Sequence, residues 1–306
     1  MAPVQNENPG AALRAAENRR GIAYMVAGMG CLVVNDSAVK YVGQSMSVAQ
    51  MITVRGLMAV TMLLAVARAL GVTRHLGQLF HRTVGMRVVL DALTTLLFIY
   101  SLMHLPIGNA TAINLGSPLI MALLAAMFLG EHPGVRRWLA IGAGFVGVVL
   151  VIQPRLDGFN AWSLMCLAAT VSQSVRDMLT RSIPAAVPAL LIAMASLAFV
   201  TLLAGLGTIV QGWQPVGWTE IGLLAFAAAL LAAGYYFVIS SMRHGEMSMV
   251  APFRYTGLLV ALLTGFVVWG EVPTAMAWGG IALLLAAGVY LLHDERRRRN
   301  DGVPLA

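Results

Sequence analysis

The chain has 306 residues, of which 59% are hydrophobic and only 11% are charged, against about 45–50% apolar and about 25% charged residues in soluble domains. This composition excludes an ordinary water-soluble fold. The formal net charge of +7 would suit a nucleic-acid-binding protein, but the arginines are scattered at the ends of apolar runs instead of clustered on a polar domain. We therefore expect an integral membrane protein without a nucleic-acid partner.

Apolar runs follow one another along almost the whole chain. The polar residues 1–20 precede the first run, and because no cleavage site is visible we expect an uncleaved cytoplasmic tail. A spanning helix needs about 20 mainly apolar residues. Such runs lie near 21–41, 47–70, 84–104, 106–130, 134–153, 159–182, 185–210, 218–241, 247–270 and 274–293. They lack the alternation of barrel strands, and so predict an all-α membrane protein of ten transmembrane helices.

The arginines predict how these helices are oriented, because short cytoplasmic loops are enriched in Lys and Arg. Every second loop carries arginine, and the loops between them hold only Arg155. We therefore expect an inner-membrane protein with both termini in the cytoplasm. The tail 294–306 contains four consecutive arginines, Arg296 to Arg299, which we interpret as an anchor at the anionic lipid surface. Nucleic-acid binding is the alternative for this run.

The two halves of the chain resemble each other. A shift of 140 residues superimposes nine identities without a gap, among them Gly130-Glu131 on Gly270-Glu271 and Pro133 on Pro273. A shift of 141 residues places Asp36 on Asp177. Each half, 21–153 and 154–293, therefore holds five helices. Five is odd, so the second repeat is inverted, which is typical of transporters whose substrate site lies at the repeat interface near the midplane.

Several short motifs also resemble the drug/metabolite transporter superfamily, in its EamA-type ten-helix branch. They are Asn35-Asp36 with Lys40, Arg55-Gly56, the Gly-Glu pair that closes helices 4 and 9, and the segment 251–255. The resemblance covers nearly the whole chain and includes YddG-type amino-acid exporters, while 251–255 resembles an S-adenosylmethionine carrier. It implies a central cavity among helices 1 to 4 and 6 to 9. Helices 5 and 10 would lie outside and form packing contacts or a homodimer.

Charged groups inside spans cost about 2.5–3.5 kcal/mol at a helix centre and need partners or water. Lys40 lies four residues after Asp36, where a helix brings the two side chains together. Asp177 and Arg181 repeat this spacing in helix 6. We interpret the pairs as an outer and an inner gate, and the alternative is that each pair only neutralises itself.

Arg254 lies deep in the membrane, about 12 Å into helix 9 at 1.5 Å per residue, and Arg55 and Asp91 are equally deep. The guanidinium of Arg254 suits the carboxylate of an amino-acid-like substrate, and Asn114 is its counterpart in helix 4. The alternative is an internal salt bridge from Arg254 to Asp91 or Asp36. Asp91 is also a candidate for the cavity wall, as a structural partner or as a proton carrier.

Aromatic and proline residues complete the set of candidates. Tyr100, Tyr235 and Tyr255 are candidates for substrate binding, although aromatic residues in membrane helices more often pack or face lipid. Pro118 in helix 4 and Pro252 in helix 9 should kink their helices and act as hinges. Because they do not coincide under the repeat shift, we expect the two halves to bend differently.

These features predict a secondary transporter that exports a small molecule, with amino acids first. The alternative substrates are S-adenosylmethionine or a vitamin, and a membrane scaffold or channel is the rival class. We predict no enzyme activity, since neither a metal-ligand cluster nor a Ser, His and Asp set stands out. Neither a cofactor nor a metal is expected, and the partners are the substrate and membrane lipid.

Overall fold

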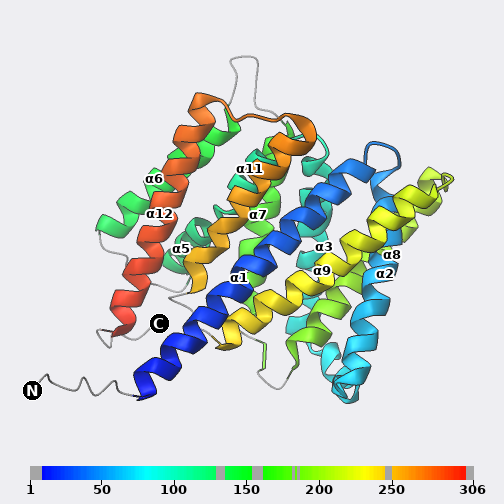
Figure 1. Ribbon diagram of the computed structural model, residues 1–306, viewed down its shortest axis with the longest axis horizontal. Coiled ribbons are helices and arrows are strands. Elements are labelled where there is room, and N and C mark those ends of the chain that lie inside the picture. Colours follow the sequence, from blue (N-terminus) through cyan, green and yellow to red (C-terminus); the bar gives the residue numbers. More distant parts are fainter. Residues whose placement is uncertain are drawn as a thin grey trace, which may run out of the picture.

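The computed structural model describes residues 9–128, 135–153, 161–180, 183–184, 187–244 and 250–300, and these parts are helical apart from short connections (Figure 1). The helices of the first half are α1 (Pro9–Val42), α2 (Val48–Ala69), η1 (Val72–Phe80), α3 (Arg82–Leu102), α4 (Ile107–Asn114), α5 (Ser117–Phe128) and α6 (Val135–Ile152). Those of the second half are α7 (Ala161–Thr180), α8 (Ala189–Gln211), α9 (Trp218–His244), η2 (Ala251–Tyr255), α11 (Thr256–Trp269) and α12 (Ala275–Asn300).

The expected ten spans correspond to these helices, with α4 and α5 forming the fourth span and η2 and α11 the ninth. Within the described residues, 7 helices are long and apolar enough to cross a membrane, and shorter apolar runs lie in α6 and α12. The helix α7 is less apolar because its second half carries polar and charged side chains. The protein is thus an all-α, multi-pass membrane protein.

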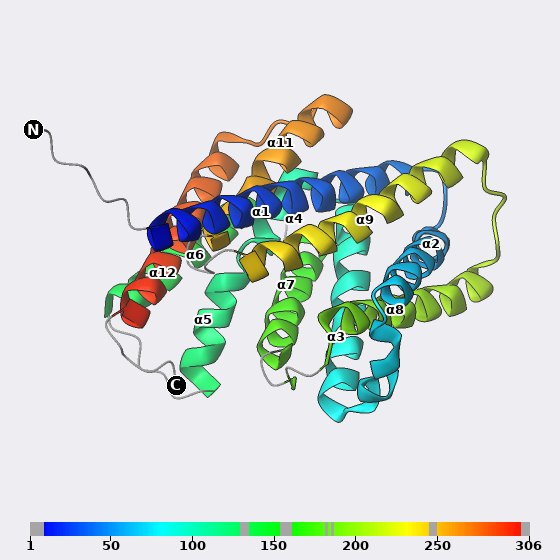
Figure 2. The same cartoon turned by 60° about the horizontal axis from the view of Figure 1, so that its bottom comes forward.

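Contacts between the halves follow an inverted repeat. The first helix of each half packs against the third helix of the other, so α1 lies along α9 and α7 lies along α3 (Figures 1 and 2). The second helices, α2 and α8, pack against each other, and so do the fifth helices, α6 and α12. This exchange is what a two-fold axis through the bundle requires. The two five-helix repeats are therefore interlocked.

Spans 4 and 9 are interrupted at equivalent places. The fourth span breaks between Asn114 and Ser117, and the ninth changes from a 3-10 turn to an α-helix at Tyr255 and Thr256. A shift of 140 residues brings the two interruptions together, although one is a break between two α-helices and the other a change from a 3-10 turn to an α-helix. Pro118 lies in the first turn of α5, where a proline starts a helix without removing a bond, and the hinge role of Pro118 and Pro252 stays a prediction.

Small residues set the closest helix contacts. The backbones of α6 and α12 cross at Gly147 and Gly280, where a methyl group on Gly280 would lie 2.6 Å from the Gly147 carbonyl oxygen. The α6 and α12 pair forms one edge of the bundle in Figure 1. Its tryptophans Trp138 and Trp278, which coincide in the repeat, are 45% and 48% exposed. That surface suits lipid or a second copy of the chain, and homodimerisation remains a prediction.

The two ends of the bundle differ. At one end α1, α3 and α11 finish and α4 begins; we call it the Lys40 end. At the other, which we call the Asp177 end, α7 finishes and α3 and α8 begin. On the outside of α2 and α8 an apolar groove of about 710 Å³ is lined by exposed side chains such as Leu57, Leu206 and Ile209, as expected for a surface that faces acyl chains.

Candidate functional site

One ion pair joins three helices at the Lys40 end. The ammonium of Lys40, on α1, lies 2.6 Å from Glu271 Oε1, beyond the end of α11, and donates to the carbonyl oxygen of Leu105 at 2.7 Å. The other oxygen of Glu271 accepts from the first amide of α4, on Ile107, at 2.9 Å. The Lys40 side chain is 8% exposed and lies 4.8 Å from the centre of the Trp269 ring. These contacts hold α1, α4 and α11 together.

The expected ion pair between Lys40 and Asp36 is not formed. Asn35 donates to Asp36 at 2.9 Å and accepts from buried Arg55 at 3.1 Å, and Arg55 also acts on Asp36 electrostatically. Lys40 reaches Glu271 instead, because there a carboxylate and a free carbonyl oxygen together satisfy more of the ammonium than one carboxylate along the same helix. The spacing of four residues allows an ion pair between Asp36 and Lys40 but does not determine which carboxylate Lys40 binds.

A small pocket lies on the Glu271 side of this ion pair. The pocket, of about 160 Å³ at the Lys40 end, is lined by Asn109, Gln153, Glu271 and Thr274, among others. The Glu271 side chain is 22% exposed, so the ion pair lies at the boundary between this pocket and the packed interior.

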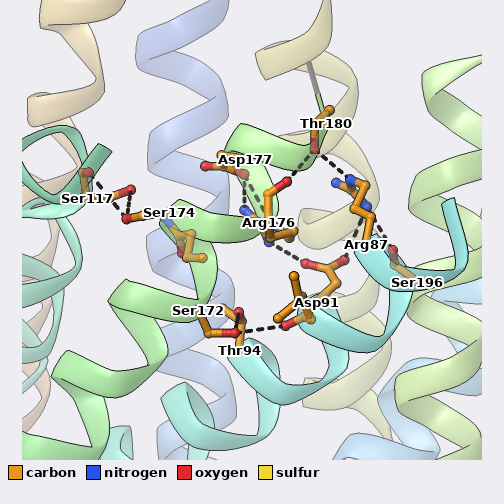
Figure 3. A network of polar contacts seen from close by, with 12 residues as sticks. Arg87, Asp91, Thr94, Ser117, Ser172, Ser174, Arg176, Asp177, Thr180 and Ser196 are labelled. Atoms are coloured by element: carbon orange, nitrogen blue, oxygen red, sulfur yellow. Dashed lines mark hydrogen bonds and ion pairs between the residues drawn. The ribbon is translucent and has the colours of Figure 1, made fainter. Parts of the chain in front are cut away.

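A second charge cluster lies at the Asp177 end, between α3 and α7 (Figure 3). Arg176 binds Asp177 through two nitrogens, at 2.7 and 3.0 Å, and forms an ion pair with Asp91. Arg87 lies 3.7 Å from Asp91 and donates to hydroxyl groups on α7 and α8. Asp91 is therefore occupied by two arginines, which favours its expected structural role over direct substrate binding. Arg181, the other expected member, lies outside the described residues.

Polar pairs connect α7 to its neighbours between the two charge layers. Asn114 donates to Gln173 at 3.0 Å across α4 and α7, Ser117 lies 3.1 Å from Ser174 and Thr94 donates to Ser172 at 3.0 Å. Gln173 was not among the predicted residues. The run Ser172-Gln173-Ser174 inside a spanning helix could have indicated it, because polar side chains in a membrane need a partner.

Arg254 lies in η2 and is partly exposed. The two acidic groups that were its expected alternative partners are used elsewhere: Asp91 binds Arg176, and Asp36 lies with Asn35 and Arg55. Among the described residues Arg254 forms no ion pair.

The three tyrosine candidates lie in different surroundings. Tyr235, on α9, lies within electrostatic range of Arg55 and of the Asp91 cluster, between the two charge layers. Tyr100 is in the last turns of α3, where its carbonyl oxygen lies 3.0 Å from a ring nitrogen of His104. Tyr255 packs against Gly288 of α12, so closely that a methyl group there would meet its hydroxyl oxygen. This position does not favour the expected binding role of Tyr255.

The described residues contain no group of three or more His, Cys, Asp and Glu side chains arranged to hold a metal ion. Hydrogen bonds and ion pairs in the charge layers and along α7 join helices of opposite repeats.

Comparison with known proteins agrees with this arrangement. The EamA-like transporter family matches residues 19–153 and again 160–293. The chain is 30% identical over 212 residues to a riboflavin transporter of Rhizobium johnstonii, covering 69% of this chain and 70% of the relative. It is 23% identical to an S-adenosylmethionine uptake transporter of Rickettsia felis, covering 65% of this chain and 67% of the relative.

A third relative is the pseudopaline exporter CntI of Pseudomonas aeruginosa, 26% identical, with 69% of this chain and 75% of the relative covered. A solved crystal structure with 18% identity superimposes with a TM-score of 0.60 over 94% of this chain and 99% of its own, which supports the fold. Both repeats match the family model, and the packing of the helices has the inverted symmetry of such carriers. The chain belongs to the EamA-like transporter family.

Proposed function

We propose that the protein is a secondary transporter that moves a small metabolite across the inner membrane by alternating access, with both termini in the cytoplasm. The observation that carries this proposal is the ion pair between Lys40 and Glu271, which joins three helix ends drawn from both repeats. A carrier must close one side of its site while the other is open. This ion pair supplies such a closure at the Lys40 end, which lies on the outer side of the membrane in the orientation that the arginine distribution predicts.

The Asp177 end supplies the counterpart. There Arg176 joins α7 to α3 through Asp91, and Arg87 extends the contact to α8. All these contacts are polar, so they can be exchanged for hydrogen bonds to water without exposing an apolar core. We infer that the two charge layers open in turn, with the interrupted spans 4 and 9 bending at Asn114 and Arg254.

Arg254 supports a substrate with a negative group. Arg254, which forms no ion pair with any residue that the structure describes, lies beside the break of span 9 and suits a carboxylate, to which its guanidinium can donate two parallel hydrogen bonds. Amino acids, moved outward, are the substrates that this arginine favours. The names of the relatives make riboflavin and S-adenosylmethionine the alternative substrates to test.

Counterflow in proteoliposomes tests the proposal. Proteoliposomes that contain the purified protein are loaded with an unlabelled amino-acid mixture, riboflavin or S-adenosylmethionine. Entry of the same labelled compound is then followed with and without a pH gradient. We expect saturable exchange of one class, lost in Arg254→Ala and kept in Arg68→Ala, which removes an exposed arginine at the end of α2. Exchange of none of these compounds by folded protein would favour the scaffold class.

A further inference from the structure

The amide pair at the break of span 4 differs from the other polar contacts of α7. The helix α4 ends at Asn114 and α5 begins at Ser117, and α7 packs along both pieces. At this break Asn114 Nδ2 donates to Gln173 Oε1 at 3.0 Å, and Gln173 Nε2 lies 3.5 Å from Asn114 Oδ1. The two carboxamides thus face each other as a reciprocal pair.

The hydroxyl groups of the neighbouring pairs form their hydrogen bonds within the protein. Ser174 is fully buried and bonds backbone carbonyl groups on α7 and α5 in addition to the hydroxyl of Ser117. Ser172 bonds Thr94 and the carbonyl oxygen of Leu90, and both of its contacts lie between α3 and α7. These hydroxyl groups have their hydrogen bonds inside the protein, so they act as links between helices.

The amide pair has hydrogen-bonding groups that the pair itself does not use. A carboxamide has two N–H donors and an oxygen with two lone pairs, and the reciprocal pair uses one donor and one lone pair of each side chain. Asn114 and Gln173 each keep one donor and one lone pair with no other partner among the described residues, and both side chains are partly exposed. Inside a membrane such groups need water or a ligand.

We propose that Asn114 and Gln173 form a substrate subsite that binds a neutral, flat edge of alternating C=O and N–H groups, as in a cyclic imide, a lactam or a carboxamide. The free lone pair of one carboxamide lies beside the free N–H of the other, and together they are the complement of such an edge. The subsite rests on the proposed transport function and adds a substrate class to it. A flavin ring, which carries an imide edge, belongs to this class, and among the amino acids those with a carboxamide side chain do.

The repeat makes this subsite one-sided. Under the repeat shifts Asn114 falls on Arg254 and Gln173 falls on Leu32, so the equivalent place in the second half has a cation and no amide partner. A substrate held by both places would present its neutral edge to α4 and α7 and a negative or electron-rich group to η2. The two halves therefore define one orientation of the bound molecule.

Binding of two small flavins to the purified full-length protein tests the subsite. Lumiflavin has a free imide N–H, and N3-methyllumiflavin has a methyl group in its place. We expect wild-type protein to bind lumiflavin about ten-fold or more tightly than the methylated form, because the methyl group removes a hydrogen bond and leaves a polar group of the subsite without its partner. Gln173→Leu should bind lumiflavin about ten-fold more weakly and no longer distinguish the two.

Ser172→Ala is the matched control, since it removes a polar group of the same helix that is bonded inside the protein; it should bind as wild type does. Equal binding of the two flavins by wild type, no binding of either, or unchanged binding in folded Gln173→Leu would overturn the subsite. Counterflow separates the two proposals. If exchange is the same in wild type and Gln173→Leu, the proposed transport function stands and the subsite is refuted. If the protein binds flavin but exchanges none of the compounds, the subsite stands as a binding site and the transport function is refuted.

Discussion

Replacing Lys40 by methionine should open the Lys40 end. Removing one partner of a buried ion pair costs about 3–5 kcal/mol, because the other charge stays behind without compensation. The Lys40 side chain is 8% exposed but that of Glu271 is 22% exposed, and Glu271 keeps the amide of Ile107, so we expect the lower limit. About 3 kcal/mol shifts the ratio of closed to open states by about 150-fold.

A cysteine at Ser37 reports this shift. Ser37 lies about one turn before Lys40 on α1, is 6% exposed and donates to Thr264 of α11, so it is covered when the Lys40 end is closed. In a background without Cys31 and Cys166, a membrane-impermeant thiol reagent should label Ser37→Cys slowly. The rate should rise by up to about 100-fold with Lys40→Met, because labelling follows the population of the open state.

A double-mutant cycle with Glu271→Gln then isolates the ion pair. The single variants should both raise the labelling rate, and the double variant should not exceed Lys40→Met. Lys40→Arg, which keeps the charge, should label close to the wild-type rate. Equal labelling of wild-type and Lys40→Met protein, with both folded and eluting as the same species, would refute the assignment of this ion pair to closure.

Three further predictions concern stability, measured as the melting temperature of purified protein in detergent. Gly280→Ala should destabilise the fold by about 1–3 kcal/mol, since the new methyl group meets a carbonyl oxygen of α6. Gly279→Ala, with open space around the new methyl group, should not destabilise it. Equal losses of stability in the two variants would refute the packing argument. Tyr255→Phe should be neutral or stabilising by up to about 1 kcal/mol, because the buried hydroxyl has no partner among the described residues, and Gly288→Ala should be tolerated better in that background. Asp91→Asn should destabilise the fold by about 3–5 kcal/mol and so lower the melting temperature, because two arginines lose their shared carboxylate; an unchanged melting temperature would contradict this role.

The membrane class and the inverted repeat were predictable from the order of residues. Hydropathy requires only that apolar runs be about as long as the bilayer is thick, and the identities that place Gly130-Glu131 on Gly270-Glu271 are properties of the chain itself. The packing of α1 on α9 and of α7 on α3 is consistent with two five-helix repeats that are related by a two-fold axis. The position of the break in span 4 followed only in part, because Pro118 indicates where a helix starts and not where the preceding one stops.

Partners of the charged and polar groups were decided by the tertiary structure. Spacing along a helix suggested Asp36 for Lys40, but the residue that binds it, Glu271, is 231 positions away in the chain. Asn114 finds Gln173 59 positions away, on a helix of the other repeat. A polar side chain in a membrane must find a partner, and the sequence by itself determined that need together with the depth of each group. Only the crossing of the two repeats decided which partner meets it, because helices that are distant in sequence lie side by side.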